Sequence, residues 1–346
     1  MAFTTINKST DYMNTKLYTG TGSAQSISSV GFQPDLIWGK NRSATWNHIF
    51  TDAVRGANKQ ISSNLTNAES SNTGEFTAFG SDGFSVGTGS TLNGSGNNIC
   101  SWNWKANGAG SSNTDGTITS TVSASTTSGF SVVKWTGSGG NATIGHGLGA
   151  VPKMIIVKSL ANATSWMVYH SAIGNNSEIY LNGNNAAAAS STAWQDTDPT
   201  SSVFYVAGGA GDGVNASGDY IAYCFAEKQG FSKFGSYAGN ASADGTFVYT
   251  GFKPAFVILK NTATTDSWVM FDNKRPNPYN VIGSILQPNT NIAETANSAF
   301  NIDFVSTGFK IRGTDGAVNG SGNTIIFMAF AAAPLVSSNG VPATAR

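Results

Sequence analysis

Residues 93–106 read NGSGNNICSWNWKA, and close variants return at residues 215–228 (NASGDYIAYCFAEK) and 319–332 (NGSGNTIIFMAFAA). Asparagine and glycine tolerate a positive φ, so each start of this motif predicts a tight turn. The apolar and aromatic run behind the turn predicts a strand. Because the run is nearly continuous rather than alternating, we expect this strand to be buried on both faces or covered by a neighbouring unit.

Two further motifs precede each copy. The first places a proline ahead of an apolar run that ends in lysine, and it occurs as GFQPDLIWGKN from Gly31, LGAVPKMIIVKS from Leu148 and GFKPAFVILKN from Gly251. Proline lacks a backbone donor and has a fixed φ, which suits the start of a strand. In the second motif a tryptophan opens another apolar stretch, at Trp46, Trp166 and Trp268. Together the two motifs predict a hairpin.

These repeats divide the chain into three units. Short β-branched and aromatic runs alternate with turn residues, as in sandwiches and barrels, and helical periodicity is almost absent. We therefore predict an all-β fold of three tandem β-sandwich or jelly-roll-like domains, each of about a hundred residues, strung like beads that pack on each other. The predicted boundaries are 1–108, 109–229 and 230–334, followed by a loose tail at 335–346.

Three kinds of segment connect the expected strands. A Ser/Thr-rich stretch from Gly108 to Gly129 is compatible with a linker or an added edge strand. Short Ala-containing patches begin at Thr66, Asn184 and Thr290, at the same place in each unit. They are long enough for one helical turn or a loop.

Composition excludes several function classes. Charged residues make up 11% of the 346 residues, and 19 basic side chains balance 19 acidic ones. No long-range field is present to recruit nucleic acid or an anionic membrane, so we expect neither partner. The sequence has no signal-like segment and no apolar run near twenty residues, so we expect no membrane insertion and synthesis in a cytoplasm.

Two cysteines follow copies of the opening motif. Cys100 and Cys224 lie at offsets from Gly96 and Gly218 that differ by two, which predicts the same face of equivalent strands. They belong to separate units, so we expect two buried thiols and neither a disulfide nor a metal pair.

Catalytic signals are sparse. His48, His146 and His170 are the three histidines, and no HxxxH or Cys/His cluster surrounds them, so we interpret them as structural. Asp196 and Asp198 are the closest carboxylates in a loop, and they are compatible with a calcium site or a shaped turn. We predict no catalytic residue, no cofactor and no metal site.

Aromatic residues are more informative. An all-β unit can present Trp or Tyr to stack on a sugar without any catalytic charge. Most aromatics fall in strand-like runs, so we expect Trp38, Trp46, Trp166 and Trp268 in the core. Trp194 and Tyr279 lie in loops and are the candidates for ligand binding.

The chain resembles a domain of unknown function that recurs in phage virion and tail-fibre-like proteins, notably those of marine and cyanobacterial phages. The resemblance covers about Tyr18 to Pro334, and it rests on SNTDGTITSTVSASTTSGFSVVKWTGSGGNATIGHGLGAVPKMIIVK, ASGDYIAYCFAE and FGSYAGNASADGTFVYTGFKPAFVILKN. It implies a setting rather than a mechanism, because the family offers no catalytic or ligand-contacting residues to carry over. The first unit departs most, so we hypothesise that it attaches the protein to the virion.

The resemblance and the composition together favour a non-enzymatic virion protein, a tail fibre or adhesin component whose loops contact host-surface glycan or protein. The alternative is a capsid decoration or head-fibre protein, and a polysaccharide-degrading enzyme is the weakest reading because carboxylates are few. We expect other virion proteins as partners, location in the virion, and a homo-oligomer.

Overall fold

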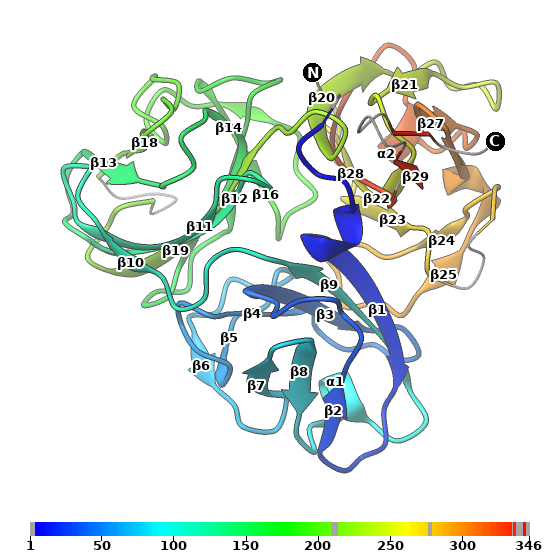
Figure 1. The fold of residues 1–346 in the computed structure, drawn as a ribbon. Helices are drawn as coiled ribbons and strands as arrows, with labels where there is room; N and C mark the ends of the chain where they lie inside the picture. The colour runs from blue at the N-terminus through cyan, green and yellow to red at the C-terminus, as the bar shows by residue number, and fades with distance from the viewer. Residues whose placement is uncertain (1–3, 209–213, 276–278, 334, 337–341, 344–346) are drawn as a thin grey trace.

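The computed structural model describes residues 4–208, 214–275, 279–333, 335–336 and 342–343. Its fold is all-β and consistent with the predicted β-sandwich class, with only short α and 3-10 segments. Figure 1 shows three lobes that meet at the centre of the molecule: blue to cyan, green, and yellow to red. None of the helices among these residues is long and apolar enough to span a membrane.

Each lobe is built on one antiparallel sheet with the same strand order. Counted along the chain, these four strands stand first, last, second and third, so the strand after the NGSG-like turn lies inside the sheet between two partners; the strand in the fourth place of this order is called the fourth strand below. Consecutive residues of these strands are buried, which confirms the prediction that both faces of each strand are covered. The sheets are β1(Met13–Thr19)-β9(Asn98–Trp104)-β3(Leu36–Asn41)-β4(Ile49–Asp52), β12(Phe130–Gly137)-β19(Gly218–Ala226)-β14(Pro152–Ser159)-β15(Met167–His170) and β20(Ser232–Ala238)-β28(Thr324–Ala331)-β22(Pro254–Asn261)-β23(Val269–Asp272).

The second sheet is extended at both edges. Strands β10 (Ser111–Asn113) and β11 (Ser120–Ser125) add to β12, and β16 (Ser177–Tyr180) and β17 (Ala188–Ala189) add to β15. The Ser/Thr-rich segment is therefore an added edge of the sheet rather than a free linker. The predicted boundaries near residues 108 and 230 fall between β9 and β10 and between β19 and β20.

A smaller sheet covers the outer face of each main sheet and encloses a separate apolar cluster. These sheets are β2(Gln25–Ile27)-β8(Gly83–Val86)-β7(Phe76–Gly80), β13(Ala142–Gly145)-β18(Val203–Val206) and β21(Phe247–Tyr249)-β27(Gly308–Ile311)-β26(Ile302–Val305). The remaining elements are η1(Ser9–Asp11), β5(Lys59–Gln60), β6(Ser70–Ser71), α1(Ser90–Asn93), β24(Ser284–Ile285), β25(Thr295–Ala296), η2(Ser298–Phe300), α2(Gly316–Asn319), β29(Leu335–Val336) and β30(Pro342–Ala343). In the predicted tail, β29 pairs with β30, and its other residues lie outside the described part of the chain.

The inner faces of the three main sheets share one apolar core. Trp104 of β9, Phe225 of β19 and Phe330 of β28 contact one another there, with ring centroids 6.2 Å (Trp104–Phe225), 5.9 Å (Trp104–Phe330) and 6.1 Å (Phe225–Phe330) apart. All three rings are at most 3% exposed. The units therefore pack on each other as expected, because each of them buries the inner face of its main sheet against the other two.

The repeated asparagine of the opening motif acts through its side chain. Asn93, Asn215 and Asn319 are buried, and none of them has a positive φ, whereas Gly96, Gly218 and Gly322 do. The amide of Asn93 accepts a hydrogen bond from Thr21 N and donates to the carbonyls of Ser23 and Gly87. Our explanation from backbone conformation therefore holds for the glycine and is wrong for the asparagine, which ties the turn to neighbouring loops.

The two cysteines are free and buried, but they do not share a face. Cys100 belongs to the central core, and Cys224 to the outer core of the second unit. The register explains this difference, because Trp38 pairs with Trp102 while the equivalent Ile156 pairs with Tyr223. The turn before β19 is one residue shorter than its counterpart before β9, which inverts the parity predicted from the sequence.

Replacing Trp104 with alanine should destabilise all three units together. The change leaves a cavity at the point where three sheets meet, and it should cost about 3–5 kcal/mol of the free energy of unfolding. Trp104→Phe should cost less, because the indole N–H has no hydrogen-bond partner among the described residues. Calorimetry should show one cooperative transition that shifts as a whole, whereas three separable transitions would contradict a shared core.

Candidate functional site

The last residue of the fourth strand in each main sheet reaches across to the next unit. These equivalent residues are Asp52, His170 and Asp272. Asp52 accepts from the Tyr223 hydroxyl at 2.9 Å, and Asp272 accepts from Trp102 Nε1 at 3.0 Å. Nε2 of His170 lies 3.1 Å from the carbonyl of Phe327. The contacts run cyclically from the first unit to the second, the second to the third, and the third to the first.

Two of the three junctions contain a buried arginine. Arg275 Nε donates to Asp272 at 2.6 Å and its Nη1 donates to Glu294 at 3.1 Å, while Arg42 of the first unit binds the same glutamate. Arg55 bridges Asp52 and Glu69 in the same way at the junction with the second unit. Neighbouring carboxylates raise the pKa of Arg275 against the opposing effect of burial. These charges are therefore engaged in holding the units together.

The three histidines are buried, and each accepts a hydrogen bond at Nδ1. In His170, Nδ1 accepts from Ala172 N at 3.2 Å, so the neutral ring donates from Nε2 to Phe327 O. Nδ1 of His146 accepts from Leu148 N, and its Nε2 lies 3.2 Å from Thr200 O. Nδ1 of His48 accepts from Trp38 Nε1 at 2.9 Å. Burial lowers the pKa of all three, to about 4 for His170.

The repeated lysines of the strand motif are also buried. Lys40, Lys158 and Lys260 are the penultimate residues of their strands. Their ammonium groups donate to backbone carbonyls, and burial lowers the pKa of each to about 8. Lys40 donates to Asn291 O of the third unit at 3.2 Å, and Lys260 donates to Asn184 O of the second at 3.1 Å. Each Ala-containing patch is thus a loop that runs into a two-residue strand, β6, β17 or β25, and its backbone contacts the neighbouring unit.

The two residues that the sequence suggested for ligand contact differ widely in exposure. Trp194 is 2% exposed and packs edge-on against Tyr169, so the prediction of a loop platform is wrong for Trp194, whose ring joins the outer core of the second unit. Tyr279 is 76% exposed. Asp198 accepts from Tyr169 OH and Asn175 Nδ2, while Asp196 stands in a turn with φ 48°. Among the described residues, no group of His, Cys, Asp and Glu is arranged to hold a metal ion.

Trp46 is a second aromatic residue that the sequence placed wrongly. Trp38, Trp166 and Trp268 are in the core as predicted, but Trp46 is 38% exposed. In the hairpin register Ile49 pairs with Gly39 and Met167 pairs with Val157, so His48, not Trp46, is the counterpart of Trp166. The tryptophan motif of the first unit is therefore shifted by two residues, which places its ring at the surface.

This ring lines a surface pocket of about 240 Å³, which we call the Trp46 pocket. All of its side chains are uncharged: Trp46, Asn47, Ile49, Gln60, Ile61, Ser62, Leu65, Asn67, Ala68, Ser70 and Thr91. Amides and hydroxyls that form hydrogen bonds thus surround one partly exposed indole. No sequence motif marked this pocket, because its residues come from a hairpin, a loop and the short helix α1.

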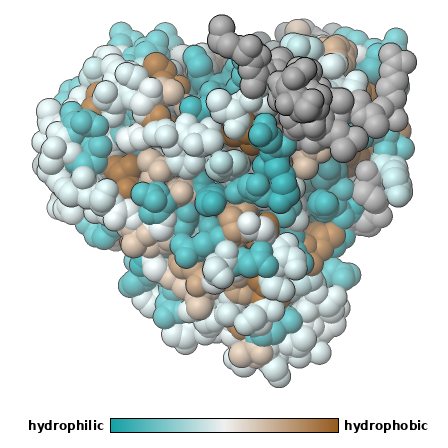
Figure 2. All heavy atoms as spheres, in the orientation of Figure 1, coloured by the Kyte–Doolittle hydropathy of each residue, from teal (hydrophilic) through white to brown (hydrophobic). Residues whose placement is uncertain are grey.

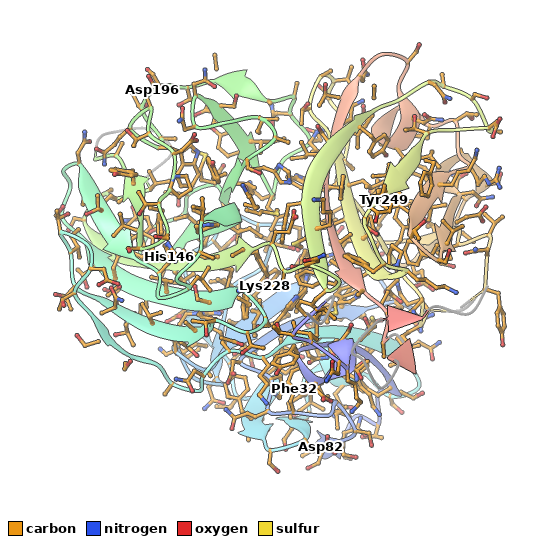
Figure 3. The ribbon with its side chains drawn as sticks, turned by 45° about the horizontal axis from the view of Figure 1, so that its top comes forward. Phe32, Asp82, His146, Asp196, Lys228 and Tyr249 are labelled. Carbon is orange, nitrogen blue, oxygen red and sulfur yellow. The ribbon has the colours of Figure 1, made fainter. Side chains whose placement is uncertain are left out.

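A second pocket, of about 300 Å³, lies where the second unit leads into the third. We call it the Tyr249 pocket, since Tyr249 is 64% exposed on its wall and an ion pair between Glu227 and Lys233, 2.7 Å long, forms another part. Figure 3 labels Tyr249 on the third unit and Lys228 on the connecting segment. Figure 2 shows a surface on which apolar residues form small patches among polar and neutral ones.

Acid should destabilise the protein through His170. The folded-state pKa of about 4 lies below the ordinary value of 6.5, so protons bind more strongly to the unfolded chain between these values. Stability is therefore full above pH 6.5 and falls as pH drops toward 4, by up to about 3 kcal/mol from this residue. Urea unfolding of wild type and His170→Gln at pH 7 and pH 4.5 measures the difference. An equal acid sensitivity in the two proteins would contradict the assignment.

Removing Asp272 should cost about 3–5 kcal/mol of unfolding free energy, because Arg275 then stays buried without its closest counter-charge. The double variant Asp272→Ala/Arg275→Met should recover part of that loss. The matched control is Asp219→Ala, which breaks the partly exposed 2.8 Å ion pair with Lys134 and should cost less than about 1 kcal/mol. Equal effects of Asp272→Ala and Asp219→Ala in urea unfolding would refute the role of the junction.

Comparison with known proteins adds a family. No curated protein matches the chain. A family model described as a domain of unknown function (DUF7483) matches residues 8–334, which include all three main sheets and both pockets. The chain therefore belongs to the DUF7483 family.

Proposed function

We propose that this chain is a non-enzymatic structural protein of a phage virion, a tail fibre or adhesin component that contacts the host surface. The observation that carries the proposal is the pair of aromatic-lined pockets on a rigid three-lobed β body. Aromatic rings beside hydrogen-bonding groups recognise glycans and proteins without reactive chemistry. The virion setting comes from the sequence resemblance to phage proteins.

The distribution of charge supports adhesion over hydrolysis. A polysaccharide-degrading enzyme needs a pair of carboxylates that flank the bond to be cleaved. Asp52, Asp272 and the partly buried Glu294 are bound by arginines at the junctions of the units. The other buried carboxylates among the described residues are engaged as well: Asp35 and Glu75 accept from the backbone N–H groups of Ala106 and Leu92, and Asp303 pairs with Arg312. In the pockets the one carboxylate is Glu227, which pairs with Lys233. This arrangement makes the enzyme the weakest of the three readings.

The second candidate is a capsid decoration or head-fibre protein, and the pseudo-threefold arrangement favours it. Three similar sheets surround the aromatic contact of Trp104, Phe225 and Phe330, so the chain has the outline of a trimer made from one polypeptide. Such a body matches a local threefold position of a lattice, where symmetric assemblies commonly bind. In this role the partners are capsid proteins, and in the first role they are other tail proteins.

Immunogold electron microscopy of intact virions with an antibody against this chain distinguishes the two roles. We expect label at the tail, together with binding of the purified full chain to host cells. Label spread over the head without cell binding would overturn the adhesin assignment and support the decoration role. Absence of the chain from purified virions would overturn both.

A further inference from the structure

We propose that the Trp46 pocket binds an uncharged saccharide residue. The proposal rests on the adhesin function above and adds its ligand class and its site. No ionisable side chain lines the pocket, which offers two asparagines, a glutamine, two serines and a threonine around one indole. A pyranose ring presents an apolar face for stacking and hydroxyls at its rim for hydrogen bonding, which is the complement of such a lining.

Gln60 supplies an unsatisfied hydrogen-bond acceptor. Its Oε1 atom is buried and has no partner among the described residues, although its backbone is fixed by pairing of β5 with β6. Buried polar atoms in folded proteins nearly always have a partner, so we assign the partnerless Oε1 of this lining residue to a group on the ligand. A sugar hydroxyl is a donor of the required kind.

Neighbouring elements hold the walls in place. The carbonyl of Trp46 accepts from Lys40 Nζ at 2.8 Å. On the opposite side, the carbonyls of Ser62 and Leu65 accept from Trp166 Nε1 of the second unit at 3.0 and 3.1 Å. The pocket is thus formed before any ligand arrives, which lowers the entropic cost of binding. Its volume of about 240 Å³ limits the occupant to a single small ring.

Two of the pocket residues, Trp46 and Gln60, are specific to the first unit. By the strand registers, Thr164 and Asp266 stand where the first unit has Trp46, and Glu178 and Ile285 stand in place of Gln60. Core positions such as Trp38, Ile156 and Ile258 stay apolar in all three units. An exposed tryptophan that the repeat does not require for packing is therefore explained by binding rather than by folding.

Saturation-transfer NMR on the full chain tests the proposal, with methyl glycosides of glucose, galactose, mannose and N-acetylglucosamine as probes and glucuronic acid as the charged comparator. We expect at least one neutral glycoside to bind and glucuronic acid to bind more weakly. Trp46→Ala should weaken binding at least tenfold and Gln60→Ala several-fold, while Trp46→Phe should retain part of it. Thr164→Ala is the control and should bind as wild type, Tyr249→Ala reports separately on the Tyr249 pocket, and unchanged melting temperatures exclude misfolding as the cause.

The outcomes separate this inference from the proposed function. No binding of any glycoside, preference for glucuronic acid, or loss of binding in Tyr249→Ala with none in Trp46→Ala would each overturn the Trp46 assignment. If labelled wild type and Trp46→Ala then bind host cells equally, the adhesin function stands without this site. If saccharide binding depends on Trp46 but neither protein binds cells and the antibody labels the head, the site stands and the adhesin function fails.

Discussion

The contact of Trp104, Phe225 and Phe330 constrains the whole structure, because three sheets can meet there only if each offers an apolar inner face. The outer face of each sheet is already covered by its own small sheet. The strands in the middle are therefore buried on both sides, which explains their unbroken apolar sequences. The low charge content follows from the same geometry, since so much of each sheet is interior.

The three junctions around this contact use two kinds of polar contact. The end of the fourth strand needs a polar partner in the next unit, and the first and third units use an aspartate with a buried arginine. The second unit has His170 instead, and Ile173 follows it three residues later where the others carry arginine. A neutral imidazole donates to the Phe327 carbonyl and needs no counter-ion. This junction is therefore sensitive to acid. The other two junctions depend on ion pairs.

Local motifs predicted which segments form strands. They predicted less well which residues of one unit correspond to which residues of another. The proline and NGSG-like motifs identified the strands, their double-sided burial and the hairpins, since these depend on residue type over a few positions. Cys224 and Trp46 were misplaced because a one-residue change in a turn, or a two-residue shift in a hairpin, changes which side a residue faces. The unbroken apolar runs predicted that the units pack on each other, but which residues meet in the shared core depends on contacts between units that no local pattern encodes.

The same repetition that builds the core leaves the surface free to diverge. Any substitution at the inner positions must suit three sheets at once, whereas Trp46, Gln60 and Tyr249 lie where one unit differs from its counterparts without affecting the others. Function in such a scaffold is therefore to be sought where the pseudo-symmetry fails at the surface. The Trp46 pocket meets that criterion most fully, because the residue that breaks the repeat is also the one whose exposure the core does not explain.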